Sequence, residues 1–167
     1  GPRFHAGEVV IEGLERQVAK SVRDLADFST GAAITEQRLL DYQERLQRSG
    51  LFEGVSVTAD ADPAQADAAT ITVRVREAPL QQATFGVGVS ANSGARVSVE
   101  HMHRRIGGLR ATLRNKLEWG TKRTLYEGEL ASHALEGLYR NLLGGASERI
   151  ESDTDRVYST RVRLGRA

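Results

Sequence analysis

Residues 48–57 read Arg-Ser-Gly-Leu-Phe-Glu-Gly-Val-Ser-Val, and this stretch decides the fold of the first half of the chain. Gly50 can adopt the left-handed conformation that closes a helix. Phe52 follows two residues later and is expected to pack under that helix. Val55 and Val57 then alternate with polar neighbours, as in a strand with one covered face. The stretch therefore predicts a helix that passes directly into a strand.

The residues before this stretch predict one strand and two helices. Residues 7–13 are short, β-branched and end in glycine, which is typical of a strand. Apolar residues at helical spacing then predict a helix over residues 14–26. Thr35 is a candidate N-cap for a second helix that is expected to end at Gly50. One face of this second helix is marked by Leu39, Leu40, Gln43 and Leu46.

The residues after the stretch complete a small α+β domain. Val57 and its alternate neighbours form one strand, and residues 71–76 alternate in the same way. A polar hairpin loop with a proline is expected between them, over residues 61–67. The order is therefore β-α-α-β-β, and both helices are expected on one face of a three-stranded sheet, because that arrangement buries all the apolar stripes. This domain is predicted to span residues 1–79.

From residue 80 to residue 167 the pattern changes to longer alternating segments. The clearest runs over residues 109–119, where apolar residues alternate with charged or polar ones; others cover residues 84–91, 96–100 and 158–164. Segments of about ten residues with one apolar and one charged face are typical of transmembrane β-barrel strands. This half supplies only four or five such strands, whereas the smallest barrels need about eight. We interpret it as the antiparallel N-terminal strands of an incomplete barrel.

The composition excludes several classes of protein. Lys and Arg number 23 against 22 Asp and Glu, so the formal charge of +1 gives no reason to expect a nucleic-acid partner. The chain has no cysteine, which excludes disulfides and thiolate metal sites. No apolar run approaches the ~20 residues of a membrane helix.

The order of the motifs resembles the TamA-like members of the BamA/TamA superfamily. The helix end at residues 48–57 is similar to the corresponding signature of a POTRA domain. Residues 83–89 and 93–96 resemble the first barrel hairpin of TamA-type proteins. The later segments that share this resemblance are residues 132–135, 138–140, 148–150 and 163–166.

The resemblance implies a Gram-negative outer-membrane protein whose POTRA domain lies in the periplasm. It implies a non-enzymatic role, without cofactor or metal, in inserting or secreting outer-membrane proteins such as autotransporters. The implied partners are unfolded outer-membrane protein clients and a periplasmic or inner-membrane subunit similar to TamB. A TamA-like parent is favoured by residues 132–150, with BamA-like proteins and two-partner secretion transporters as alternatives.

A POTRA sheet can bind a client polypeptide by adding it as an extra strand at an open edge. The candidate edge is the strand over residues 53–58, provided that this strand lies at the edge of the sheet. Its candidate binding residues are Glu53, Val55, Ser56, Val57 and Thr58.

Other groups of residues favour structural roles. His101 and His103 share a strand face, but no third ligand stands nearby. The acidic residues between 148 and 155 lack the pattern of a calcium loop. Trp119 is expected either in an interfacial aromatic girdle or in a core. Leu135, Leu138 and Leu142 fit either a short amphipathic helix or, from the resemblance, a strand and turn.

Two other classes of function stand against the membrane interpretation. The first is a soluble protein-binding module whose second half is a small sandwich or pairs its strand edges with a second copy. The second is a KH-type RNA-binding module, which needs a basic Gly-x-x-Gly loop between its helices. Residues 28–34 contain one glycine and no basic residue, so this class is disfavoured.

Overall fold

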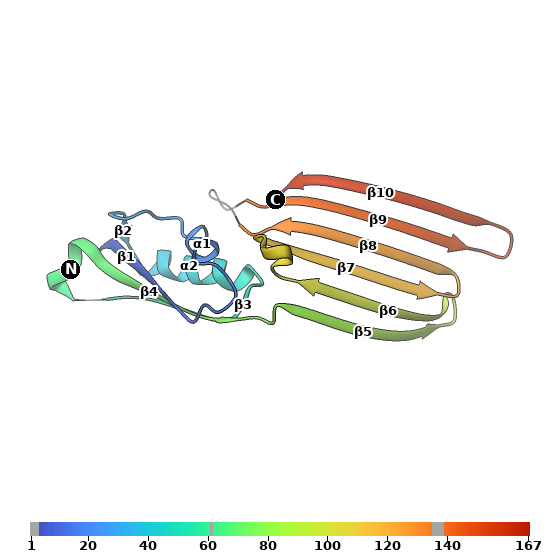
Figure 1. The fold of residues 1–167 in the computed structure, drawn as a ribbon, viewed down its shortest axis with the longest axis horizontal. Helices are drawn as coiled ribbons and strands as arrows, with labels where there is room; N and C mark the ends of the chain where they lie inside the picture. Colours follow the sequence, from blue (N-terminus) through green and yellow to red (C-terminus); the bar gives the residue numbers. More distant parts are fainter. Residues whose placement is uncertain (1–3, 61, 135–138) are drawn as a thin grey trace. The chain divides into compact units, whose positions relative to one another are not determined.

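The computed structural model describes residues 4–60, 62–134 and 139–167. These residues form two compact units, one built from residues 4–78 with Ala134 and Tyr139, and the other from residues 79–133 and 140–167. Figure 1 shows the elements of both along the chain. No helix in these described ranges combines the length and the apolar character needed to cross a membrane.

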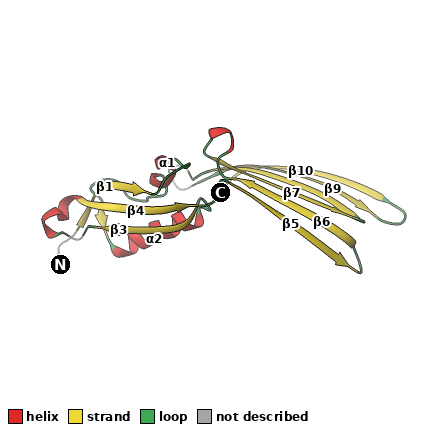
Figure 2. Ribbon diagram, turned by 60° about the horizontal axis from the view of Figure 1, so that its bottom comes forward, coloured by secondary structure: helices red, strands yellow, loops and turns green. Residues whose placement is uncertain are grey.

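The first unit is a mixed sheet covered by helices. Its sheet has the order β2-β1-β4-β3, in which β1 is parallel to β4 and the other neighbours are antiparallel. Figure 2 shows α2 lying along β3 and β4. In chain order the elements are β1 (Phe4–Glu12), α1 (Ala19–Arg23), β2 (Ala33–Ile34), α2 (Glu36–Arg48), β3 (Phe52–Ala59), the 3-10 helix η1 (Pro63–Ala68) and β4 (Ala69–Glu77).

The predicted helix end at residues 48–57 is confirmed in detail. The Thr35 hydroxyl accepts a hydrogen bond from the Arg38 amide at 3.2 Å and caps α2. Gly50 has φ +72°, so it closes the helix as expected. Phe52 is buried with Leu46 in the core between α2 and the sheet. Leu40 does not share this buried face, because 51% of it is exposed.

The predicted helix over residues 14–26 is wrong in extent, because α1 covers only Ala19–Arg23. Gly13 has φ +91° and Val18 is extended, so residues 14–18 turn without forming a helix. Leu14, Val22 and Leu25 still pack into the core, which explains their helical spacing in the sequence. The expected three-stranded sheet also gains the two-residue strand β2, and η1 occupies most of the predicted hairpin loop.

The second unit is a single antiparallel sheet of six strands, each paired with its neighbour in sequence. The expectation of four or five strands is therefore too low. One of the additional segments is β8, which the sequence pattern did not single out. The strands are β5 (Gln81–Ser90), β6 (Gly94–His103), β7 (Ala111–Gly120), β8 (Arg123–Ser132), β9 (Asn141–Glu151) and β10 (Arg156–Arg166), with the short 3-10 helix η2 (Ile106–Gly108) before β7.

This sheet is held by its backbone ladder rather than by a core. Only three of its apolar residues among those described are buried, namely Ala111, Leu125 and Ala131. Leu135 and Leu138 of the candidate amphipathic helix lie outside the described residues, whereas Leu142 lies in β9. β5 and β10 are the two edges of the sheet. The α+β unit followed by antiparallel strands agrees with the fold class that the sequence predicted.

Candidate functional site

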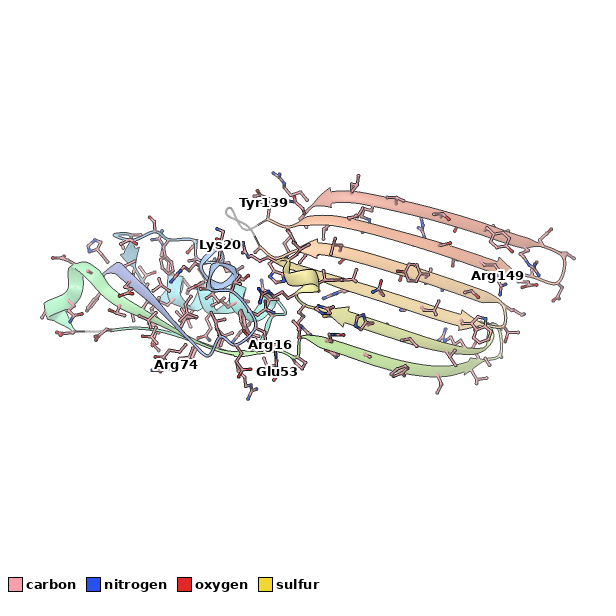
Figure 3. The ribbon with its side chains drawn as sticks, viewed as in Figure 1. Arg16, Lys20, Glu53, Arg74, Tyr139 and Arg149 are labelled. Carbon is pink, nitrogen blue, oxygen red and sulfur yellow. The ribbon has the colours of Figure 1, made fainter. Side chains whose placement is uncertain are left out.

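Strand β3 is at the edge of the first unit, as the binding proposal requires. All five candidate binding residues lie on it. Val55 and Val57 pack partly against the core, whereas Glu53, Ser56 and Thr58 are exposed. Glu53, labelled in Figure 3, forms an ion pair of 3.5 Å with Arg76 of β4.

One hydrogen-bond donor on this edge already has a partner. The backbone N–H of Val57 donates to the Gln43 side-chain oxygen of α2 at 3.1 Å. Alternate residues of an edge strand direct their backbone groups outward, so Val55 and Ala59 belong to the same outward set as Val57. Gln43 was expected only as part of the helix face, because a contact between residues 14 positions apart leaves no signal in the sequence.

A carboxylate that the sequence did not single out fixes the loop between β1 and α1. Glu77, at the end of β4, accepts hydrogen bonds from the backbone N–H groups of Glu15, Arg16 and Gln17 at 2.6–3.0 Å. Three consecutive donors on one carboxylate form a charge-assisted cluster. The cluster ties residues 15–17 to the last residue of β4.

Two buried polar side chains organise one end of the second unit. The Arg104 guanidinium donates to the Pro79 carbonyl at 2.7 Å and to the Gln82 side chain at 3.2 Å. His133 lies 2.8 Å from the Arg104 carbonyl, so its Nε2 carries the proton and donates. Burial is the main reason that the pKa of His133 is lowered. The hydrogen bond to the Arg104 carbonyl raises this pKa, whereas the charges of nearby arginines lower it further. His133 is therefore a neutral donor that holds the start of β5 in place through Arg104.

The two faces of the six-stranded sheet differ sharply. We call the face bearing Phe85, Val87 and Val89 the outward face; these side chains are 76%, 89% and 86% exposed. The opposite face is hollowed, with a cavity of about 730 Å³. Small residues of β9 form part of its lining, and the charged lining residues are Glu100, Arg114, Lys116, Glu127, Glu129, Arg161 and Arg163.

The apolar band on the outward face crosses the strand register diagonally. Residues that are paired from strand to strand across the sheet form a register row. In the row near the β5–β6 hairpin, the residues of β5–β7 are apolar and those of β8–β10 are polar or aromatic: Val87, Val97, Trp119, Thr124, Arg149 and Tyr158. In the row near the start of β5, the residues of β5 and β6 are polar and those of β7–β10 are all leucine: Gln81, His103, Leu113, Leu130, Leu143 and Leu164. Barrel strands tilt by roughly 35–45°, so a band parallel to a membrane must slant across the register in this way.

The remaining candidate residues are engaged in local contacts. His101 contacts the Gln81 side chain at 3.3 Å, and His103 Nδ1 accepts from the Arg105 amide at 3.2 Å. Glu148 and Glu151 lie in β9 and pair with Arg123 and Arg156. Trp119 is on the outward face and is 64% exposed. Among the described residues no group of three metal-ligating side chains comes together.

Comparisons with known proteins agree with both units. Residues 4–78 match the POTRA family model, described as "Surface antigen variable number repeat". The structure is similar to BamA from Haemophilus ducreyi lacking POTRA domains 1–3, with a TM-score of 0.72 and 17% identity over 98% of this chain and 32% of that one. It is also similar to CdiB from Acinetobacter baumannii, with a TM-score of 0.66 and 11% identity over 99% of this chain and 34% of that one.

At these identities the likeness to solved structures is a likeness of fold, and the chain spans about a third of the length of each structure. Neither structure selects a TamA-like parent in particular. The six strands resemble part of the BamA barrel, and the unit before them is the POTRA domain. Residues 4–78 are therefore a POTRA domain, and the POTRA unit followed by six antiparallel strands has a fold similar to that of part of BamA and of CdiB.

Proposed function

We propose that this chain is part of a non-enzymatic machine of the Gram-negative outer membrane that inserts or secretes outer-membrane proteins. Residues 1–79 act in the periplasm, where the POTRA sheet receives unfolded clients such as autotransporters. Residues 80–167 supply strands of the membrane barrel. A periplasmic or inner-membrane subunit similar to TamB is the proposed partner. The similarity to BamA and CdiB supports this role.

The diagonal apolar band is the observation that carries the membrane part of the proposal. A sheet in water has no reason to expose Phe85, Val87 and Val89, three apolar side chains at alternate positions of β5. In a bilayer the same side chains face lipid, and the polar face lines the interior of a barrel. The slant of the band supplies the strand tilt that a barrel requires.

We expect an arginine on the outward face to block membrane insertion. The chain is diluted from urea into phosphatidylcholine vesicles, and the emission of Trp119, its only tryptophan, is recorded. Wild type is expected to shift to the blue. Val99→Arg, in the middle of β6 on the outward face, should reduce insertion, because it places a charge in lipid at a cost of about 2 kcal/mol.

Ser98→Arg is the matched control, because Ser98 immediately precedes Val99 in β6 and lies on the opposite face of the sheet. It should insert as wild type does. If neither variant differs from wild type, or if wild type shows no shift, the sheet does not enter the bilayer. A stable dimer in buffer would then favour the soluble alternative, in which β5 and β10 pair with the edges of a second copy.

We propose that the client adds to the edge of β3 and that Gln43 must first release Val57. A peptide copying residues 156–166 serves as a client, because it is itself a membrane-type strand. Gln43→Ala removes the competing acceptor, so we expect about fivefold tighter binding, the equivalent of one net hydrogen bond. The shifts of the β3 amide signals in NMR spectra measure it.

Gln37→Ala is the control for this experiment. Gln37 lies on the same helix, but its side chain is exposed and donates to Asp41 of α2 at 2.7 Å. The edge proposal is wrong if the peptide perturbs amides elsewhere and leaves Val55 and Val57 unchanged. The gating role of Gln43 is wrong if the two alanine variants bind the peptide equally.

A further inference from the structure

Arg149 interrupts the apolar character of the outward face near the hairpin end of β9. In the strand register it lies between Thr124 of β8 and Tyr158 of β10, and Trp119 follows Thr124 in the same row. Trp119 and Tyr158 are 64% and 68% exposed on this face. Figure 3 labels Arg149 close to the turn between β9 and β10. The cation thus has Tyr158 beside it on β10, and on the other side Thr124 separates it from Trp119.

The positive charge of Arg149 is only partly balanced by its surroundings. Its guanidinium donates to the Thr124 hydroxyl at 3.4 Å, which is a neutral partner. Glu151, two residues after Arg149 on the same face of β9, forms an ion pair of 2.6 Å with Arg156. Glu148 is on the opposite face, where it pairs with Arg123. Among the strand residues of this face, Arg149, Glu151 and Arg156 carry a net charge of +1, from two arginines and one glutamate. Asp153 and Asp155 lie beyond the strand ends, in the turn between β9 and β10.

The position of this cluster along the strands limits what can lie against it. It is at the end opposite to residue 79, where the chain enters the sheet, and next to the turn at residues 152–155. In the proposed membrane orientation this end faces the outer leaflet. A cation on the lipid face is unfavourable at the bilayer centre and is tolerated at the interface, where aromatic residues gather. The anions available at that depth are lipid phosphates.

We propose that Arg149, in the register row of Trp119 and Tyr158, and Arg156, two residues before Tyr158 on β10, bind the phosphate of a lipid headgroup. This inference rests on the proposed function, because only an inserted sheet presents this face to lipid. A guanidinium can hold two phosphate oxygens at once, and the neighbouring aromatic rings bury the adjoining apolar part of the lipid. The site anchors the hairpin ends of β7–β10 at the membrane surface.

Vesicle binding followed through Trp119 tests the site, since this residue lies in the same register row as Arg149. The full chain is titrated with phosphatidylcholine vesicles and with vesicles that also contain phosphatidic acid. Wild type is expected to prefer the phosphatidic acid vesicles by about fivefold, the gain for one basic side chain at an anionic surface. Arg149→Gln should lose this preference, and added inorganic phosphate should not compete with the lipid.

Arg161→Gln makes the same change of charge on the opposite face of β10 and should keep the preference. An equal loss of the preference in both variants would show a general attraction between the positive charges of the chain and the anionic vesicles, and would overturn the site. Equal binding of wild type to both kinds of vesicle would also overturn the lipid site, but it would not contradict the proposed insertion of the sheet into the membrane. If inorganic phosphate competed with the vesicles, the ligand of the site would be a free anion and not a lipid headgroup. Absence of any Trp119 shift in either vesicle would instead contradict the proposed function. Circular dichroism of both variants checks that the strands are formed.

Discussion

Leu46→Ala is expected to lower the free energy of unfolding of the POTRA domain by about 3–5 kcal/mol. Leu46 is fully buried between α2 and the sheet, with Tyr42, Ile71 and Phe52 in the same core. Truncation removes apolar contacts and leaves a cavity that the surrounding sheet cannot fill. Urea unfolding followed by circular dichroism at 222 nm measures the loss, because both helices belong to this domain.

Leu40→Ala supplies the comparison on the same helix. Leu40 is 51% exposed, so the same truncation should change the free energy of unfolding by less than about 1 kcal/mol. Equal effects of the two substitutions would show that α2 presents a different face to the sheet. The proposed client-binding edge depends on this packing, because α2 also carries the Gln43 side chain that accepts from the Val57 backbone N–H.

Gly13→Ala should destabilise the same domain by a similar amount, about 3–5 kcal/mol. Gly13 has φ +91°, and a Cβ atom there would lie 2.0 Å from the Val75 carbonyl oxygen. Neither β1 nor β4 can retreat easily, because the two strands are joined by their parallel ladder. The turn that leads from β1 to the loop held by Glu77 therefore requires glycine. Thermal unfolding of the purified variant measures the effect.

Gly31→Ala separates backbone strain from the steric clash. Gly31 has φ +84°, but nothing lies within 4 Å of the point that an alanine methyl group would occupy, so only the left-handed conformation is penalised. The expected loss is about 1–2 kcal/mol. If Gly13→Ala is no more harmful than Gly31→Ala, the close approach of residue 13 to β4 is not rigid.

The features that the sequence predicted well are those set by local chemistry. The Thr35 cap, the left-handed Gly50 and the buried Phe52 all follow from residues that are neighbours in the chain. Strand alternation also predicted which residues of β7 share a face, because side chains of a strand alternate strictly. The exposed outward face and the polar opposite face follow from that periodicity.

The features that the sequence missed depend on contacts between distant residues. Residues 14–18 have helical spacing, yet the Glu77 carboxylate from the far end of the domain holds the loop over residues 15–17. Strand β2 is too short for any periodicity. Gln43 resembles an ordinary helix residue until its side chain is seen to reach the β3 edge.

The sequence by itself determined the order of elements, the helix end at Gly50, the transition after residue 79 and the two-faced character of the strands. Only the tertiary structure decided that β3 is an edge, that Gln43 occupies it and that Arg149 lies between Trp119 and Tyr158. The physical reason is that periodicity and capping act over a few residues. Strand order and register are set instead by hydrogen bonds between segments that the sequence does not pair.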